Sequence, residues 1–503
     1  MHRLAAIVSV ASSLALLSPA TSAQGLRIGI QEDPDALDPA TSGFFVGRVV
    51  FAALCDKLIE IGPGLEFQAQ LATSWRWSDD DRVLTLVLRP GVRFHDGEPL
   101  DAAAVKINLD RYRTAPESRR KAETRAIADV EVVDPLTVRL RLSEPFAPLL
   151  SVLADRAGMM MSPKALTALG DKIGSAPVCA GPFRFVRRVA QERIELARFD
   201  RYWNAAEIKV DAITYTVVPD SSVRLLNLRA GALDMIERLA PSDMRILRAD
   251  ASLKLVATPA LAYQALVINV GNGPRSGSPL GRDPRVREAL ELALDRDAIN
   301  RVVFDGEFVP GNQAEASGSR FFAADRPAPS RDVARARALL RQAGHERLGL
   351  ALTVINNPTD SQLAQVIQSM AAEAGFDIRI EALEAAAHLA AATRGVFDVA
   401  LMPWSGRVDP DGNIAIWIQC DGFANVGKHC RPEVDAMLTR ARSVNDAEQR
   451  RQIYSQIAHA YLDERPMIFL FHAKWLWAMR AAVQGFAPRA DGLIRPQGIS
   501  IAN

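Results

Sequence analysis

Polar and apolar residues repeat with two different periods along the chain, which predicts a mixture of strands and helices. Residues 83–88 form an apolar run of strand length, and Pro90 and Gly91 after it predict a type II turn, since proline fixes φ and glycine accepts a positive φ. Asp101 predicts the N-cap of a helix, because its carboxylate can accept a hydrogen bond from a free backbone N–H. Alternation over residues 130–142 predicts a hairpin.

The second half of the chain carries the pattern of a parallel sheet. A long helix is expected to begin at Asp283, with Pro284 in its first turn. A strand at 350–356, a helix at 361–374 and a strand at 377–380 form a βαβ unit, which favours a parallel pair of strands. The chain as a whole therefore predicts an α/β fold.

One segment marks a change of domain. Residues 263–270 predict a strand, and the residues from Asn269 to Pro284 are rich in glycine, proline and serine. A two-lobed protein would pass from one lobe to the other just before this loop. The sequence does not establish whether the chain later returns.

Length and charge exclude several classes of protein. A chain of 503 residues is long enough for two to four domains with large cores, so a small disulfide-stapled module is excluded. Lys and Arg number 60 against 59 Asp and Glu, a formal net charge of +1. Without a basic stripe, no nucleic-acid partner is expected. Hydrophobic residues at 49% and charged residues at 24% are typical of a globular protein.

The N-terminus predicts export. Arg3 precedes an apolar run from residue 4 to 17, and small residues up to Ala23 follow, as in a cleavable signal peptide over residues 1–23. The run is too short to cross a membrane, which needs about 20 apolar residues. No cysteine lies at the cleavage site, so the mature protein is expected in the periplasm without a lipid anchor.

Export makes disulfides possible for the four cysteines, which allow three pairings. Cys420 and Cys430 are close in sequence and separated by a glycine-bearing loop, which leaves Cys55 and Cys179 as a long-range pair. The alternative is four buried free thiols, since unpaired cysteine is among the most buried residue types.

Searches for catalytic and metal-binding motifs give nothing that favours an enzyme. The chain has no Gly-x-Ser-x-Gly elbow, no His-Glu-x-x-His pair, no Walker-type loop and no Gly-x-Gly-x-x-Gly after a strand. Its seven histidines are scattered, and none is paired at helical spacing. We therefore expect no catalytic residues, no metal site and no cofactor.

One segment suits ligand recognition. Trp404, Arg407, Asp409 and Asp411 lie within ten residues that end at Asn413 and follow a predicted strand. Arg407 can hold a carboxylate or phosphate, either aspartate can hold an ammonium group, and Trp404 can stack on an apolar or sugar face. The alternative is an Asp-Pro-Asp-Gly turn with solvated charges.

Several segments in order along nearly the whole mature chain resemble the family 5 extracellular solute-binding proteins of ABC transporters, the dipeptide- and oligopeptide-binding group. These segments are 70–75, 88–97, 180–185 followed by Tyr202 and Trp203, 283–290 with Asp295 and Arg296, and 404–413. The chain departs from the family at Cys179, because members usually show Gly-Thr before the Gly-Pro at 181 and 182. Together with Cys55, this residue suggests a subgroup with its own disulfide.

The resemblance implies a two-lobed periplasmic-binding-protein-like fold of type II, of the large peptide-binding class, that closes on its ligand by hinge motion. Lobe one is expected to contain residues 24–261 and 475–503 and to carry an extra subdomain, and lobe two to contain residues 262–474. By similarity, Asp409 and Asp411 are candidates to hold a ligand amine, with Trp404 and Arg407 beside them. Looser matches to regions lining the cleft give four more candidates, each of which has a core or solvated role as its alternative: Phe44, Phe45, Tyr263 and Asn269.

The implied role is capture of a solute and its delivery to the permease subunits of an ABC importer in the inner membrane, by a protein expected to be a monomer. A peptide is the favoured cargo. Other members of the family carry nickel chelates, haem, opines or oligosaccharides, so the alternative is a non-peptide solute. A secreted hydrolase of the same fold is the alternative from another class, and the missing catalytic motifs argue against it.

Overall fold

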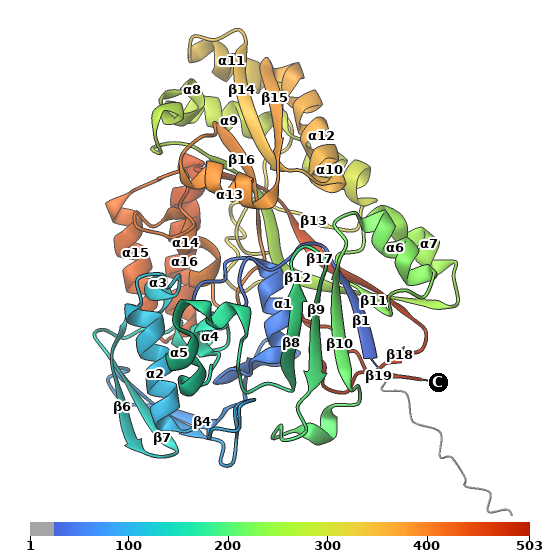
Figure 1. Ribbon diagram of the computed structural model, residues 1–503. Coiled ribbons are helices and arrows are strands. Elements are labelled where there is room, and N and C mark those ends of the chain that lie inside the picture. Colours follow the sequence, from blue (N-terminus) through green and yellow to red (C-terminus); the bar gives the residue numbers. More distant parts are fainter. Residues whose placement is uncertain (1–24, 503) are drawn as a thin grey trace, which may run out of the picture.

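A large mixed sheet extends through the computed structural model, which describes residues 25–502; the predicted signal peptide lies outside the described residues. Figure 1 shows this sheet running from the lower right of the molecule to its top. In spatial order its strands are β15 (Phe376–Leu383), β14 (Leu348–Ile355), β16 (Val399–Trp404), β12 (Leu253–Ile268), β17 (Met467–Arg480), β11 (Met235–Ile236), β1 (Gly25–Ile30), β10 (Ala212–Val217), β9 (Arg193–Arg198) and β8 (Phe183–Val189), with β13 (Val309–Pro310) also paired to β17.

Two long strands connect the two ends of this sheet. β12 and β17 pair antiparallel from Leu253 to Val267, with shifts of register between Pro259 and Tyr263 and after Gln264. Near Ala260 these strands pack in the same core as β1 and α1, whereas near Leu266 they pack in a second core with the helices of the upper part. Two cores along the same pair of strands agree with the two lobes that the resemblance implies, and the lobe boundaries given above remain a prediction.

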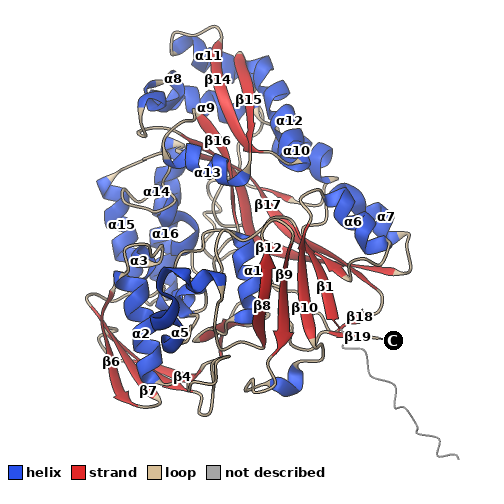
Figure 2. Ribbon diagram, viewed as in Figure 1, coloured by secondary structure: helices blue, strands red, loops and turns tan. Residues whose placement is uncertain are grey.

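A separate small sheet forms at the lower left of Figure 2. Its strands are β4 (Ala72–Trp77), β5 (Val83–Leu88), β7 (Thr137–Leu142) and β6 (Ile127–Asp134). In β5 and β7 every second residue is buried, so one face of the sheet packs in a core that also contains Val105 and Leu109 of helix α2 (Ala102–Thr114). This unit occupies the part of the sequence in which an extra subdomain is expected.

Helices cover the rest of the molecule, and two short strand pairs complete it. The other helices are α1 (Phe45–Leu54), α3 (Lys121–Thr124), α4 (Leu149–Leu153), α5 (Pro163–Leu169), α6 (Ser221–Arg229), α7 (Met244–Arg248), α8 (Pro279–Arg282), α9 (Pro284–Ala293), α10 (Arg296–Phe304), α11 (Val333–Gln342), α12 (Pro358–Ala374), α13 (Ala385–Thr393), α14 (Ile416–Ile418), α15 (Pro432–Arg442) and α16 (Ala447–Glu464). The strand pairs are β2 (Ile59–Ile61) with β3 (Phe67–Ala69), and β18 (Val483–Gln484) with β19 (Ser500–Ile501).

The local predictions with the clearest turn and cap signals are confirmed. Asp101 caps α2 by accepting from the backbone N–H of Ala104, Asp283 caps α9, and Gly91 has a φ of 75°. β14, α12 and β15 form the predicted βαβ unit with parallel strands. The prediction for β12 is wrong in length, since the strand begins at Leu253 rather than 263. Pro259 interrupts the pattern within this strand, and the part before it is held by its pairing with β17.

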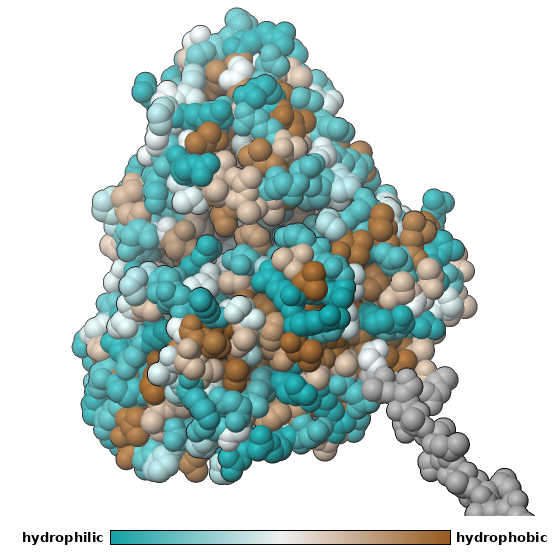
Figure 3. Space-filling view, viewed as in Figure 1, coloured by the Kyte–Doolittle hydropathy of each residue, from teal (hydrophilic) through white to brown (hydrophobic). Residues whose placement is uncertain are grey.

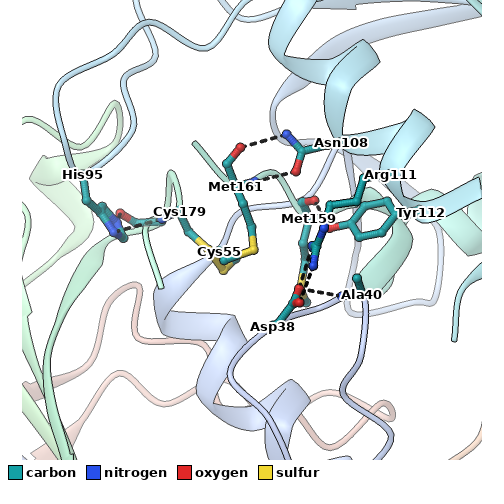
Figure 4. The surroundings of a disulfide bond; sticks show 11 residues. Asp38, Ala40, Cys55, His95, Asn108, Arg111, Tyr112, Met159, Met161 and Cys179 are labelled. Atoms are coloured by element: carbon teal, nitrogen blue, oxygen red, sulfur yellow. Dashed lines mark hydrogen bonds and ion pairs between the residues drawn. A yellow bond between two sulfur atoms is a disulfide. The ribbon is translucent and has the colours of Figure 1, made fainter. Parts of the chain in front are cut away.

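Both predicted disulfides are present. Cys420 and Cys430 are bonded, and Cys55 and Cys179 are bonded across a sequence separation of 124. Figure 4 shows the second bond at the end of α1, beside Met161, whose backbone exchanges two hydrogen bonds with the side chain of Asn108 on α2. Met161 also pairs with Cys179 through a β-bridge. The disulfide therefore joins the end of α1 to the segment around Cys179, which is linked through Met161 to α2 of the small-sheet unit.

Figure 3 shows hydrophilic residues over most of one face of the molecule, with small groups of hydrophobic residues between them. Within residues 25–502, no helix has the length and apolar character needed to cross a membrane. The same residues contain no group of His, Cys, Asp and Glu side chains arranged to hold a metal ion.

Candidate ligand-binding site

A cavity of about 70 Å³ lies where the segment after β16 faces the residues around α3 and α4. Its apolar lining includes Phe146, Pro148, Val152, Trp404, Ile416 and Phe423, and its charged lining includes Glu123, Asp155, Arg407, Asp409, Asp411 and Arg442. Apolar walls with a few convergent polar groups are typical of sites for small molecules, and a volume of about 70 Å³ holds one end group of such a molecule rather than the whole of it.

The two sides of the cavity belong to parts of the chain that are far apart in sequence and are assigned above to different lobes. Arg407 Nε lies 2.7 Å from Asp155 Oδ2. Arg48 Nη1 donates to Ser405 Oγ at 3.3 Å, and the backbone N–H of Ala147 donates to the carbonyl of Arg442. The cavity is therefore closed by direct contacts between the two sides.

Asn413 holds the segment from 404 to 413 in its shape. Its Oδ1 accepts from the backbone N–H of Arg407 at 2.6 Å and from Trp404 Nε1 at 3.3 Å, and its Nδ2 donates to Glu315 Oε1 at 2.7 Å. Its carbonyl accepts from the hydroxyl of Tyr263 at 2.7 Å. The predicted residue Tyr263 is thus a buried support for the site. With all these bonds made, the segment keeps one conformation.

Asp409 and Asp411, the predicted partners of a ligand amine, each pair with a buried arginine. Asp409 accepts two hydrogen bonds from Arg450 on α16, both of 2.8 Å. Asp411 Oδ1 accepts from Arg442 Nε on α15 at 2.6 Å. Burial raises the pKa of Asp411, and Arg442 opposes that rise. We call these four residues the paired cluster, because its two charges of each sign cancel.

Arg407 belongs to a different set of charges. Asp155 Oδ1 accepts from Arg48 Nε at 3.0 Å and from the backbone N–H of Arg156 at 2.8 Å, while its other oxygen faces Arg407. Burial alone raises the pKa of Asp155, but the guanidinium groups of Arg407, Arg48 and Arg156 hold it well below its ordinary value. Asp155 is therefore an anion surrounded by cations.

Trp404 and Arg407 support each other at the cavity wall. The guanidinium carbon of Arg407 lies 4.6 Å from the centre of the Trp404 ring, a cation–π contact. Trp417 and Phe423 pack against the other sides of Trp404, with ring centres 5.7 and 6.5 Å away. Both residues are thus held in place without a ligand, as a preformed binding site requires.

The other predicted residues do not line this cavity. The ring of Phe45 stacks on Trp475 with centres 4.7 Å apart, and the carbonyl of Phe44 accepts from Arg156 Nη2 at 2.6 Å. Asn269 is fully buried, and its side chain bonds four backbone groups, those of Asn272 (N–H and carbonyl), Gly395 and Phe397. Their ligand-binding role remains a prediction.

Sequence reasoning missed Arg48, Asp155 and Arg156, because they come from separate elements and form no local motif. One signal was available. Arg48 is the single charged residue in the ten residues of α1, whose other members are apolar or glycine. A charge inside an apolar helix is buried on folding, so a partner or a function for it is to be expected.

Comparison with known proteins places the chain in a family. The model of the bacterial extracellular solute-binding proteins, family 5, matches residues 66–425. The chain belongs to this family. A glutathione-binding protein, GsiB, of Pectobacterium atrosepticum is 29% identical over 491 residues, which cover 95% of this chain and 94% of that protein. GsiB of Escherichia coli K12 is 27% identical, with coverage of 97% and 96%.

Solved structures of similar proteins share the two-lobed fold. AgaA from A. tumefacien R10, in complex with agropinic acid, superposes with a TM-score of 0.87 at 25% identity, covering 95% of this chain and 99% of that one. A dipeptide-binding protein from Pseudoalteromonas sp. SM9913, in complex with Met-Leu, also gives 0.87 at 22% identity, with coverage of 95% and 100%. Family 5 members bind solutes for ABC importers, and the chain's relatives are binding proteins rather than enzymes.

Proposed function

We propose that this protein captures a short peptide or a similar small solute in the periplasm and delivers it to the permease of an ABC importer. Residues 24–261 with 475–503 form one lobe and residues 262–474 the other, and β12 and β17 form the hinge at their register shifts. The protein acts as a monomer, needs no cofactor and performs no catalysis. After cleavage behind Ala23 it diffuses freely.

One observation carries this proposal. The cavity is lined from both sides by residues of the two predicted lobes, with Trp404 and Arg407 facing Asp155. A solute bound there contacts both lobes at once, so its binding energy favours the closed form. The closed form is the one that presents both lobes to a permease.

The relatives narrow the class of solute. A protein 29% identical over nearly the whole chain is named for binding glutathione, a peptide with one amine and two carboxylates. A protein 25% identical was solved with agropinic acid. A glutathione-like peptide is therefore our first candidate, and an opine-like acid is the second.

Mass spectrometry of the native protein tests this function. The protein is purified without denaturant from the periplasm of its own cells, and the solutes released by unfolding are identified. We expect a stoichiometric small solute of peptide character. The same protein unfolded, washed and refolded is the control and should release none. Absence of any retained solute, together with turnover of peptides by the purified protein, would contradict the proposal.

A further inference from the structure

Charges beside the cavity do not balance on the side of Arg407. Four arginines, namely Arg48, Arg120, Arg156 and Arg407, meet two carboxylates, Asp155 and Glu123. We call these six residues the arginine cluster, and its formal charge is +2. All four guanidinium groups are largely buried: Arg48, Arg120 and Arg156 are 2% exposed as whole residues, and the Arg407 side chain is 14% exposed.

Arg156 makes the imbalance most evident. Its guanidinium forms no ion pair with any carboxylate in residues 25–502; Nη2 donates to the carbonyl of Phe44, and Nε is buried without a hydrogen-bond partner. The Nε of Arg120 is likewise buried and unpartnered. Buried cations without partners cost free energy, so a negative charge placed in the neighbouring cavity is stabilised by their electric field.

Burial, with a smaller contribution from neighbouring cations, lowers the pKa values of two of these arginines. Burial lowers the pKa of Arg156 to about 9, with Arg120, Arg48 and Arg407 adding to the effect against Asp155. Burial lowers the pKa of Arg407 to about 10, and here too Arg48 and Arg120 add to it. Both guanidinium groups are cations in surroundings that disfavour their charge. A negative charge added nearby stabilises the charged form of each.

We infer that the captured solute carries a carboxylate that contacts Arg407 in the cavity, and that Arg48, Arg120 and Arg156 hold it there through their charge. This inference rests on the proposed function and names its solute class. A planar guanidinium matches the two oxygens of a carboxylate. The carboxylates of the paired cluster are already bonded to Arg442 and Arg450, so this cavity receives the acidic end of the solute rather than its amine.

Titration calorimetry with a matched pair of probes tests the inference. Glutathione and its diethyl ester differ only in their two carboxylates, and both are titrated into refolded protein. We expect the ester to bind about 100-fold more weakly, because it cannot form the buried ion pair with Arg407. Arg407→Met should weaken glutathione by a similar factor and the ester by a much smaller one. Arg407→Lys keeps the charge but lacks the paired N–H donors of a guanidinium, so its loss of glutathione affinity should be intermediate.

A second variant separates charge from contact. Arg156 does not line the cavity, so Arg156→Met acts through the electric field and should weaken glutathione about tenfold without affecting the ester. Arg287→Met is the matched control. Arg287 is also a buried arginine that donates to backbone carbonyls, but it lies on α9, outside the cavity. The Arg287→Met variant should bind both probes with unchanged affinity. Circular dichroism confirms the fold of each variant.

The outcomes separate this inference from the proposed function. Equal affinity for acid and ester, or equal losses for both in Arg407→Met, overturns the carboxylate contact and leaves solute capture standing. If neither probe binds, the solute recovered by mass spectrometry and its ester replace them. A recovered solute without a carboxylate, including one with only a phosphate, overturns the inference alone. Recovery of no solute, together with turnover of peptides by the purified protein, contradicts the proposed function itself.

Discussion

Two buried sets of charges share the wall of one cavity and differ in their balance. In the paired cluster, Asp409 and Asp411 each bond one arginine, with distances of 2.6 to 2.8 Å. In the arginine cluster, four guanidinium groups share two carboxylates, and the guanidinium of Arg156 pairs with neither. In the first set the charges cancel within the protein, although Nη1 of Arg442 is buried without a hydrogen-bond partner. The second is completed by an anion from outside.

This difference shows that charge type alone is a poor guide to a ligand site. The aspartates that the sequence offers as ligand contacts are each paired with an arginine: Asp409 bonds Arg450 of α16 through both oxygens, and Asp411 bonds Arg442 of α15 through Oδ1. The arginine that the sequence also offers, Arg407, belongs to the set that has more guanidinium groups than carboxylates. We therefore expect the paired cluster to govern stability and the arginine cluster to govern affinity.

The largest expected effect is on stability. Asp411→Ala leaves Arg442 buried without its partner, which costs about 3–5 kcal/mol of unfolding free energy. Asp409→Ala has the same consequence for Arg450. Urea denaturation measures both losses. Asp421→Ala is the control, because Asp421 is an exposed carboxylate on the same cavity, and it should cost about 0.5 kcal/mol or less.

Affinity decides whether these aspartates also bind the solute. If either aspartate held the amine of a peptide, its alanine variant would lose affinity for peptides with a free amine and keep its affinity for the acetylated forms. We expect the folded fraction of each variant to keep its preference for glutathione over the ester. Loss of peptide binding without loss of stability would reverse the roles assigned to the two clusters.

A smaller effect is expected from the disulfide beside the paired cluster. Cys420–Cys430 closes a short loop next to Gln419, whose side-chain oxygen accepts from Arg442 Nη2 at 2.8 Å. Replacing both cysteines by serine should cost about 3 kcal/mol, the value of a short closed loop. Thermal denaturation with and without glutathione measures the cost. A large fall in glutathione affinity would show that the paired cluster also shapes the solute site.

The smallest expected change in affinity concerns Asp155, the anion inside the arginine cluster. Asp155→Asn keeps an oxygen for Arg48 but raises the formal charge of the cluster from +2 to +3. We expect glutathione to bind about threefold more tightly and the ester to be unaffected, since a less screened cation attracts a carboxylate more strongly. Calorimetry at constant ionic strength measures this change. Weaker binding of both probes would mean that Asp155 mainly positions Arg407.

Much of the fold was predictable because its signals are local. The caps at Asp101 and Asp283 and the turn at Gly91 each depend on a few neighbouring residues, and all three are confirmed. The length of β12 was not predictable in this way, because its first half is held by pairing with β17, about 200 residues away in sequence.

The site shows the same division. Trp404 and Arg407 lie on the cavity wall and were visible as one segment of sequence. The partners of Arg407 come from α1 (Arg48) and from the short 3₁₀ turn after α4 (Asp155 and Arg156), and only the folded chain brings them together. The pairing of Asp409 and Asp411 with α16 and α15 was hidden for the same reason.

A crystal structure of the protein loaded with glutathione tests the central claim most directly. We predict a carboxylate oxygen of the solute within about 3.2 Å of a guanidinium nitrogen of Arg407, with Asp409 and Asp411 still bonded to their arginines. A solute whose amine replaces Arg450 or Arg442 at those aspartates, while Arg407 contacts no part of it, would contradict the account.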